Sequence, residues 1–154
     1  MQFMRTRTNS KLVERAEASG HLTFVHGDIG PTKHLGFPKG PVSPERAMNY
    51  VGAINRTGHK HYDTVLVDGR WRLACLLYSR SFLKQHGGAA LIHDFVARPP
   101  GSKVDIWRAR FSKYSRALQH YGLEQQEDTL ALLKPFDTTI TQRELTAALR
   151  SAER

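Results

Sequence analysis

Acidic and basic side chains follow a short apolar run near the middle of this 154-residue chain. The run Thr64 to Val67 leads at once into Asp68, and Arg70 and Arg72 come two and four residues later. A carboxylate in such a place can orient or deprotonate a hydroxyl group, and guanidinium groups can hold an anion through paired hydrogen bonds. We therefore treat Asp68 as a candidate catalytic residue and the two arginines as candidate substrate-binding residues.

A second apolar run repeats this arrangement. Ala89 to Ile92 ends in His93 and Asp94, and Arg98 follows in a proline-rich loop. Because ligands of open α/β sheets bind where the strands end, we expect both runs to bring their polar residues to one rim. His93 and Asp94 thus join the candidate catalytic residues, and Arg98 joins the candidate substrate-binding residues.

The same residues also have a purely structural explanation. Asp68 paired with Arg70 or Arg72 would fix the turn from a strand into a helix. His93 with Asp94 would satisfy main-chain groups near the end of the second run. The sequence leaves the catalytic and the structural explanation open.

A glycine- and proline-rich stretch, residues 27–38, lies upstream and is predicted to be a loop. It leaves the end of a predicted strand at 22–26, so it could lie over the same rim. A phosphate cradle is one interpretation, but the stretch lacks the spacing of known phosphate-binding loops and no helix begins directly after it. A proline-stiffened lid is the interpretation that we favour.

Hydrophobic periodicity and capping residues predict an alternation of helices and strands along the chain. Helices are predicted at 10–19, 44–57, 71–85, 103–121 and from 142 onward, and strands at 22–26, 64–67, 89–92 and 129–133. Such alternation is typical of an α/β fold with a mostly parallel sheet and helices on both faces.

The chain is strongly basic, with 23 Lys and Arg residues against 14 Asp and Glu residues and a net charge of +9. This balance favours polyanionic partners, such as RNA or an acidic protein surface. The predicted helix 103–121 concentrates the charge, and a solvated helix face is the plain alternative to an anion-binding or partner-binding one. Its candidate residues are Lys103, Arg108, Arg110, Lys113 and Arg116.

The remaining composition excludes several classes of protein. The apolar stretches are far shorter than the ~20 residues that a membrane-spanning helix needs, so we expect no membrane span. One cysteine, Cys75, excludes an internal disulfide framework and a cysteine-rich zinc site, and its apolar neighbours predict a buried, inert thiol. We expect no metal site and an intracellular location, in the cytoplasm or in an organelle.

Three stretches in a fixed order carry a wider pattern. They are residues 28–32 with 36–38 (DIGPT and GFP), residues 65–75 (VLVDGRWRLAC), and residues 91–95 (LIHDF) followed by Arg98 and Pro99. Together they resemble a group of class I S-adenosylmethionine-dependent methyltransferase-like proteins. The resemblance implies a Rossmann-like methyltransferase fold, and it covers most of the chain.

The resemblance also implies a domain division and a cofactor. A basic segment at 1–8 would precede a methyltransferase-like domain at 9–134, and a C-terminal capping helix would lie within 135–154. S-adenosylmethionine would be the cofactor of any catalysis. The residues that the resemblance places near it are Asp28, Gly30 and Asp68.

Two features of that class have no counterpart in the sequence. Methyltransferases of this kind hold the cofactor against a glycine-rich turn after their first strand and bind its ribose with an acidic residue after their second. The resemblance begins near the second strand, and Arg5 and Arg7 stand where the acidic residue is expected. We therefore expect an N-terminally truncated version of the fold.

Two functions follow from these expectations. The first is a non-catalytic, cofactor-free binding or scaffold subunit of a larger assembly, with RNA-containing and organellar complexes as candidates. The alternative is an S-adenosylmethionine-dependent methyltransferase acting on an anionic small substrate, with the cofactor loop supplied by an upstream segment or a partner. In either case a sheet without its first strand has an open edge beside the strand ending in Asp68, so we expect a partner chain or a homodimer to cover it.

Overall fold

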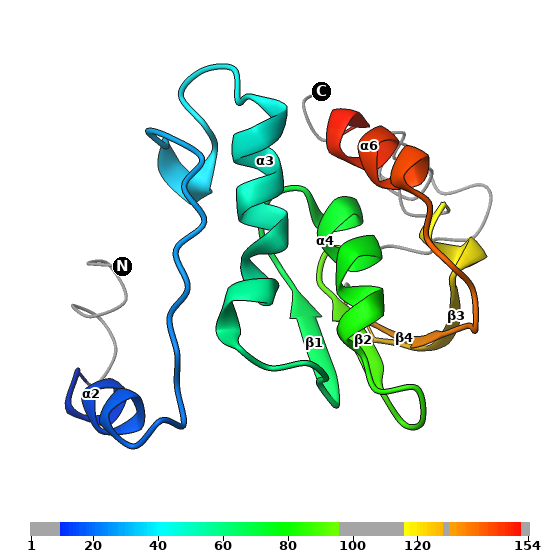
Figure 1. Cartoon of the computed structure of the whole chain (residues 1–154), viewed down its shortest axis with the longest axis horizontal. Coiled ribbons are helices and arrows are strands. Elements are labelled where there is room, and N and C mark those ends of the chain that lie inside the picture. The colour runs from blue at the N-terminus through cyan, green and yellow to red at the C-terminus, as the bar shows by residue number, and fades with distance from the viewer. Residues whose placement is uncertain (1–9, 96–115, 128–129, 152–154) are drawn as a thin grey trace.

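The computed structural model describes residues 10–95, 116–127 and 130–151 (Figure 1). Its α-helices are α2 (Ser10–Ala18), α3 (Pro44–Val51), α4 (Arg72–Ser79) and α6 (Gln142–Ser151). Its strands are β1 (Thr64–Val67), β2 (Ala89–Ile92), β3 (Tyr121–Glu127) and β4 (Leu130–Pro135), and its 3-10 helices are η1 (His34–Gly36), η2 (Gly52–Thr57), η3 (Arg80–Phe82) and η4 (Ala117–Gln119). Within these ranges, every helix is too short or too polar to cross a bilayer.

The four strands form one mixed sheet in the order β1-β2-β4-β3. β1 and β2 run parallel, whereas β4 runs antiparallel to both β2 and β3. The prediction of helices and strands in one α/β fold is confirmed, but the prediction of a mostly parallel sheet is wrong. The reason is local, because Glu127 pairs with Leu130, and a chain that returns within so few residues must run antiparallel.

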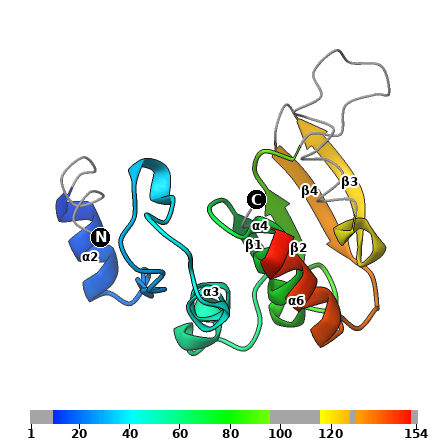
Figure 2. The same ribbon diagram turned by 90° about the horizontal axis from the view of Figure 1, so that it is seen from above.

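The helices α3, α4 and α6 pack together over one face of the sheet (Figure 2). This face holds the core, in which alternate strand residues such as Ile92 and Leu133 are fully buried. The opposite face carries a leucine row formed by register partners, Leu66, Leu91 and Leu132. In the described part of the chain, the expected helices on both faces are therefore replaced by helices on one.

Two helix starts follow the capping rules that predicted them. Ser43 accepts a hydrogen bond from the Arg46 main-chain N–H at 3.2 Å, with Pro44 in the first position of α3. At α6, Thr141 Oγ1 accepts from the Glu144 N–H, and Glu144 accepts from the Thr141 N–H at 2.8 Å. These bonds from the Thr141 main chain and hydroxyl, with another from the His120 ring, lower the pKa of Glu144 to about 2.

Three predicted elements differ from the structure. Residues 22–26 run extended but pair with no strand among the described residues, so the predicted strand does not form. The helix predicted at 71–85 ends at Ser79 and tightens into η3, because Leu83 is extended and bridges to Tyr62. At the end of the segment predicted as helix 103–121, Tyr121 starts β3 and its buried hydroxyl donates to the Leu76 carbonyl at 2.8 Å.

Candidate functional site

The polar residues after β1 and β2 meet, as the sequence predicted. Arg72 lies between two carboxylates, with Nη2 3.1 Å from Asp68 Oδ1 and Nη1 2.8 Å from Asp94 Oδ2. The Nδ1 atom of His93 lies 3.3 Å from Asp68 Oδ1 and 3.8 Å from Asp94 Oδ1. We call these four residues the strand-end cluster.

The parallel register of β1 and β2 creates this cluster. Val67 pairs with Ile92, so the residues that follow each strand emerge side by side at the same end of the sheet. The segment after each strand then turns through left-handed backbone, at Trp71 (φ 50°) after β1 and at Asp94 (φ 57°) after β2. Such a conformation is disfavoured for a bulky residue, and strained backbone of this kind concentrates at functional sites and at tightly constrained turns.

The electrostatics of the cluster favour internal pairing. The Arg72 side chain is 14% exposed, and its charge is balanced by Asp94 at 27% and Asp68 at 52% exposure. The sequence left open whether Asp68 pairs with Arg70 or with Arg72, and in the structure it forms an ion pair with Arg72. The ion pair ties the end of β1 to the first residue of α4, which is the structural explanation for these side chains.

Arg70 instead reaches the glycine-rich loop. Its guanidinium carbon lies 3.9 Å from the centroid of the Phe37 ring, a cation–π contact that brings this loop over the rim. Within the loop, the Asp28 carboxylate accepts from the Gly30 N–H at 2.8 Å. Two of the three residues predicted to contact a cofactor therefore bond to each other and stabilise a turn.

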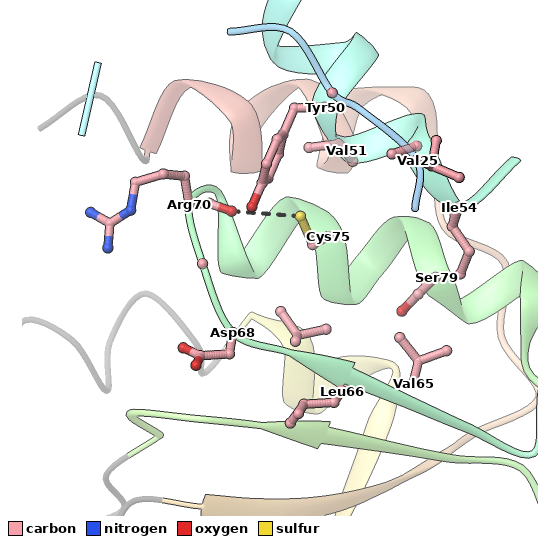
Figure 3. A pocket seen from close by; sticks show the side chains of 14 residues that line it. Val25, Tyr50, Val51, Ile54, Val65, Leu66, Asp68, Arg70, Cys75 and Ser79 are labelled. Carbon is pink, nitrogen blue, oxygen red and sulfur yellow. Dashed lines mark hydrogen bonds between the residues drawn. The ribbon is translucent and has the colours of Figure 1, made fainter. Parts of the chain in front are cut away.

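Two neighbouring cavities open between the loop, α3 and β1. One has a volume of about 260 Å³ and contacts both Asp68 and Arg70 (Figure 3). The other, of about 280 Å³, lies against the glycine-rich loop. They share four lining residues, Gly27, Tyr50, Gly69 and Arg70. Each volume lies just below the roughly 300–1,000 Å³ of common ligand pockets.

Tyr50 is a site residue that sequence reasoning missed. A Cβ atom on Gly27 would lie 2.8 Å from Tyr50 Cα, and one on Gly69 would lie 2.5 Å from the Tyr50 hydroxyl, so two glycines allow the chain to close around it. Burial raises the pKa of Tyr50, which keeps its hydroxyl neutral. The sequence signal is a polar-tipped aromatic side chain on the otherwise aliphatic face of α3.

Cys75 lies in the wall of the first cavity. Burial raises the pKa of its thiol to about 12, and Sγ lies 3.6 Å from the Arg70 carbonyl oxygen. A thiol with so little thiolate at neutral pH is a poor nucleophile. This agrees with the prediction of an inert cysteine, but Cys75 is only partly buried, because it packs against the core at the cavity wall.

Several predicted binding residues lie outside the described ranges, namely Arg98, Lys103, Arg108, Arg110 and Lys113. Arg116 is described and is exposed at the start of η4. In the described part of the chain, His, Cys, Asp and Glu side chains form no group of three that could hold a metal ion.

Comparison with known proteins gives one informative match. No protein-family model matches the chain, and no curated protein matches it either. The chain is similar to the crystal structure of a methyltransferase-like protein from Silicibacter pomeroyi, with a TM-score of 0.60 and 24% sequence identity. The match covers 92% of this chain and 70% of that one. The chain therefore has a methyltransferase-like fold.

Proposed function

We propose that this chain is a methyltransferase-like binding subunit that does not transfer methyl groups on its own. The observation that carries the proposal is the position of Arg72 between Asp68 and Asp94. A side chain that neutralises two carboxylates and is mostly buried has little capacity left for a substrate anion. The strand-end cluster then holds the two strand ends together.

The local geometry around the expected cofactor residues supports the same proposal. A carboxylate oxygen of Asp28 already accepts a hydrogen bond from the Gly30 N–H. In addition, neither cavity alone reaches the volume of a common ligand pocket. S-adenosylmethionine has a large polar surface that needs several precisely placed partners. The described residues therefore fit this cofactor poorly as they stand.

A larger intracellular assembly, in the cytoplasm or an organelle, is the proposed setting. The net charge of +9 supports an acidic partner, either RNA or protein. Binding of a fluorescent single-stranded RNA, followed by anisotropy at increasing salt, separates the two. A steep decrease in affinity with salt favours RNA, and no binding at low salt favours an acidic protein.

Methyl transfer to an anionic small substrate is the second candidate function. Asp68 and Arg70 contact the same cavity. In the described part of the chain, Arg70 Nε has no hydrogen-bond partner. Asp68 could orient a substrate hydroxyl while Arg70 holds an anionic group. The cofactor loop would come from an upstream segment or from a partner chain.

Calorimetric titration of the 154-residue chain with S-adenosylmethionine and S-adenosylhomocysteine tests the proposal. We expect no heat of binding up to about 1 mM ligand. Binding in the micromolar range would overturn the non-catalytic proposal. In that case D68N and R70M should weaken binding or turnover, whereas the matched variant R143M, at an exposed position of α6 that lines neither cavity, should leave both unchanged.

A further inference from the structure

Among the described residues, no strand pairs with the outer edge of β1, and this edge borders the first cavity. The main-chain N–H groups of Ala89 and His93 donate to the carbonyls of Asp63 (2.9 Å) and Val67 (3.1 Å), so these odd-numbered residues face β2. Because main-chain groups alternate along a strand, those of Thr64 and Leu66 face away from β2. A row of unpaired main-chain donors and acceptors is a template for another strand.

The two edges of the sheet differ in how well they are protected. At the far edge, β3 has a register shift between Leu123 and Gln125 and carries Glu124, which pairs with Lys134. Bulges and charges of this kind prevent unwanted strand pairing. By contrast, β1 reads Thr-Val-Leu-Val, without a bulge, a charge or a proline, and its residue Leu66 is 62% exposed.

The cavity beside β1 has the form of a slot for one strand. Val65, Leu66 and Val67 all line it, although their side chains alternate between the two faces of the sheet. Only a space along the strand's edge can contact all three. Val25 and Gly27 belong to the opposite wall, where the segment 22–26 that the sequence predicted as a strand leads into the glycine-rich loop.

We propose that a single extended segment of an acidic partner protein enters this slot and pairs with β1. Strand addition of this kind gives affinity through main-chain hydrogen bonds and specificity through side-chain pockets. Apolar side chains of the partner would contact Ile54 and Val65 inside the cavity and cover Leu66. This inference rests on the proposed binding function, and it adds that the partner is an acidic protein that binds through an extended segment.

A second copy of this chain fits the slot less well. Val25 and Gly27 form a wall opposite β1, so the edge of a whole folded sheet would collide with that wall, whereas one peptide would not. Two copies would also each carry a net charge of +9, which opposes their association. An acidic flank on the partner would instead lie near Arg70, at the end of the slot.

The test uses a synthetic probe, an acetylated and amidated peptide of alternating valine and threonine residues flanked by glutamates. Its binding to the full chain is measured by calorimetry, and the protected amides by hydrogen exchange. We expect protection of the Leu66 amide. A peptide with a central proline should bind about tenfold more weakly, because it loses one main-chain hydrogen bond and its extended pairing. Lysine flanks should also weaken binding.

Variants of the protein complete the test. L66P removes the free N–H at an outward edge position, where proline is tolerated, and should abolish peptide binding. L66K, which leaves the main chain intact, should weaken it if L66P fails to fold. The matched variant L123K, on the other edge strand, should bind as the parent does.

Three results would overturn the inference. They are no peptide binding at about 1 mM, protection of β3 amides in place of β1 amides, and a homodimer in analytical ultracentrifugation that L66K disrupts. None of these results bears on S-adenosylmethionine binding, so the inference and the proposed function can fail separately.

Discussion

Replacing Arg72 by methionine tests the role assigned to the strand-end cluster. The substitution keeps most of the apolar stem but removes the charge that lies 2.8 Å from Asp94 and 3.1 Å from Asp68. The two carboxylates would then face each other without the guanidinium between them, next to His93. We expect R72M to destabilise the turn between β1 and α4.

The size of the effect follows from burial. Exposed ion pairs contribute about 0.2–1 kcal/mol, whereas breaking a buried one costs about 3–5 kcal/mol. Arg72 is mostly buried, but both carboxylates are partly open to solvent, which screens the charges. We therefore expect R72M to lower the free energy of unfolding by about 2 kcal/mol. The less exposed and closer Asp94 should account for more of this loss than Asp68.

Urea unfolding followed by tryptophan fluorescence measures the loss, and double-mutant cycles with D94N and D68N divide it. We expect a coupling energy of about 1–2 kcal/mol between Arg72 and Asp94 and less than about 1 kcal/mol between Arg72 and Asp68. A total loss below about 0.5 kcal/mol would refute the reasoning, since this is the range of neutral surface changes. Arg72 would then be available to bind an anion, which favours the catalytic candidate.

Three further outcomes are expected. Glu144 has a pKa of about 2 in the fold against an ordinary 4.5, so its stabilising contribution is present above about pH 4.5 and is lost as the pH falls towards 2. In pH-dependent unfolding, E144Q should be less stable than the parent at neutral pH and equal to it near pH 2, and a constant difference would contradict this. G27A should cost about 1–3 kcal/mol in urea unfolding because its Cβ would overlap Tyr50 Cα, whereas G40A, which meets no atom within 4 Å, serves as the neutral control. Iodoacetamide at pH 8 should modify Cys75 slowly in the folded chain and quickly in urea, and equal rates would contradict its burial.

Local sequence rules predicted much of the site's framework. The two apolar runs at 64–67 and 89–92 form strands over the same residues, because each is bounded by polar and turn-forming groups. Ser43 and the pair Thr141 and Glu144 mark helix starts, since their side chains satisfy main-chain N–H groups nearby in sequence. Such signals depend on neighbours along the chain, so a single sequence contains them.

Other features depend on contacts that the sequence pattern does not encode. The direction of β4 depends on its pairing with β3, a strand that the sequence pattern did not predict and whose first residue, Tyr121, had been assigned to the end of a helix. Residues 22–26 have the alternation of a strand, yet alternation forms no strand without a partner edge. Periodicity describes one segment at a time, whereas pairing joins two.

The amino-acid sequence by itself determined the basic charge, the inert cysteine and the polar residues at two strand ends. The tertiary structure alone decided which arginine neutralises Asp68, that Arg70 covers Phe37, and that Tyr50 lines the cavities. It also decided that, within the described ranges, β1 is an edge strand of the sheet and lies beside a slot. The physical reason is that ion pairing, ring stacking and strand pairing require side chains and main chains from distant segments to meet, and only packing sets those distances.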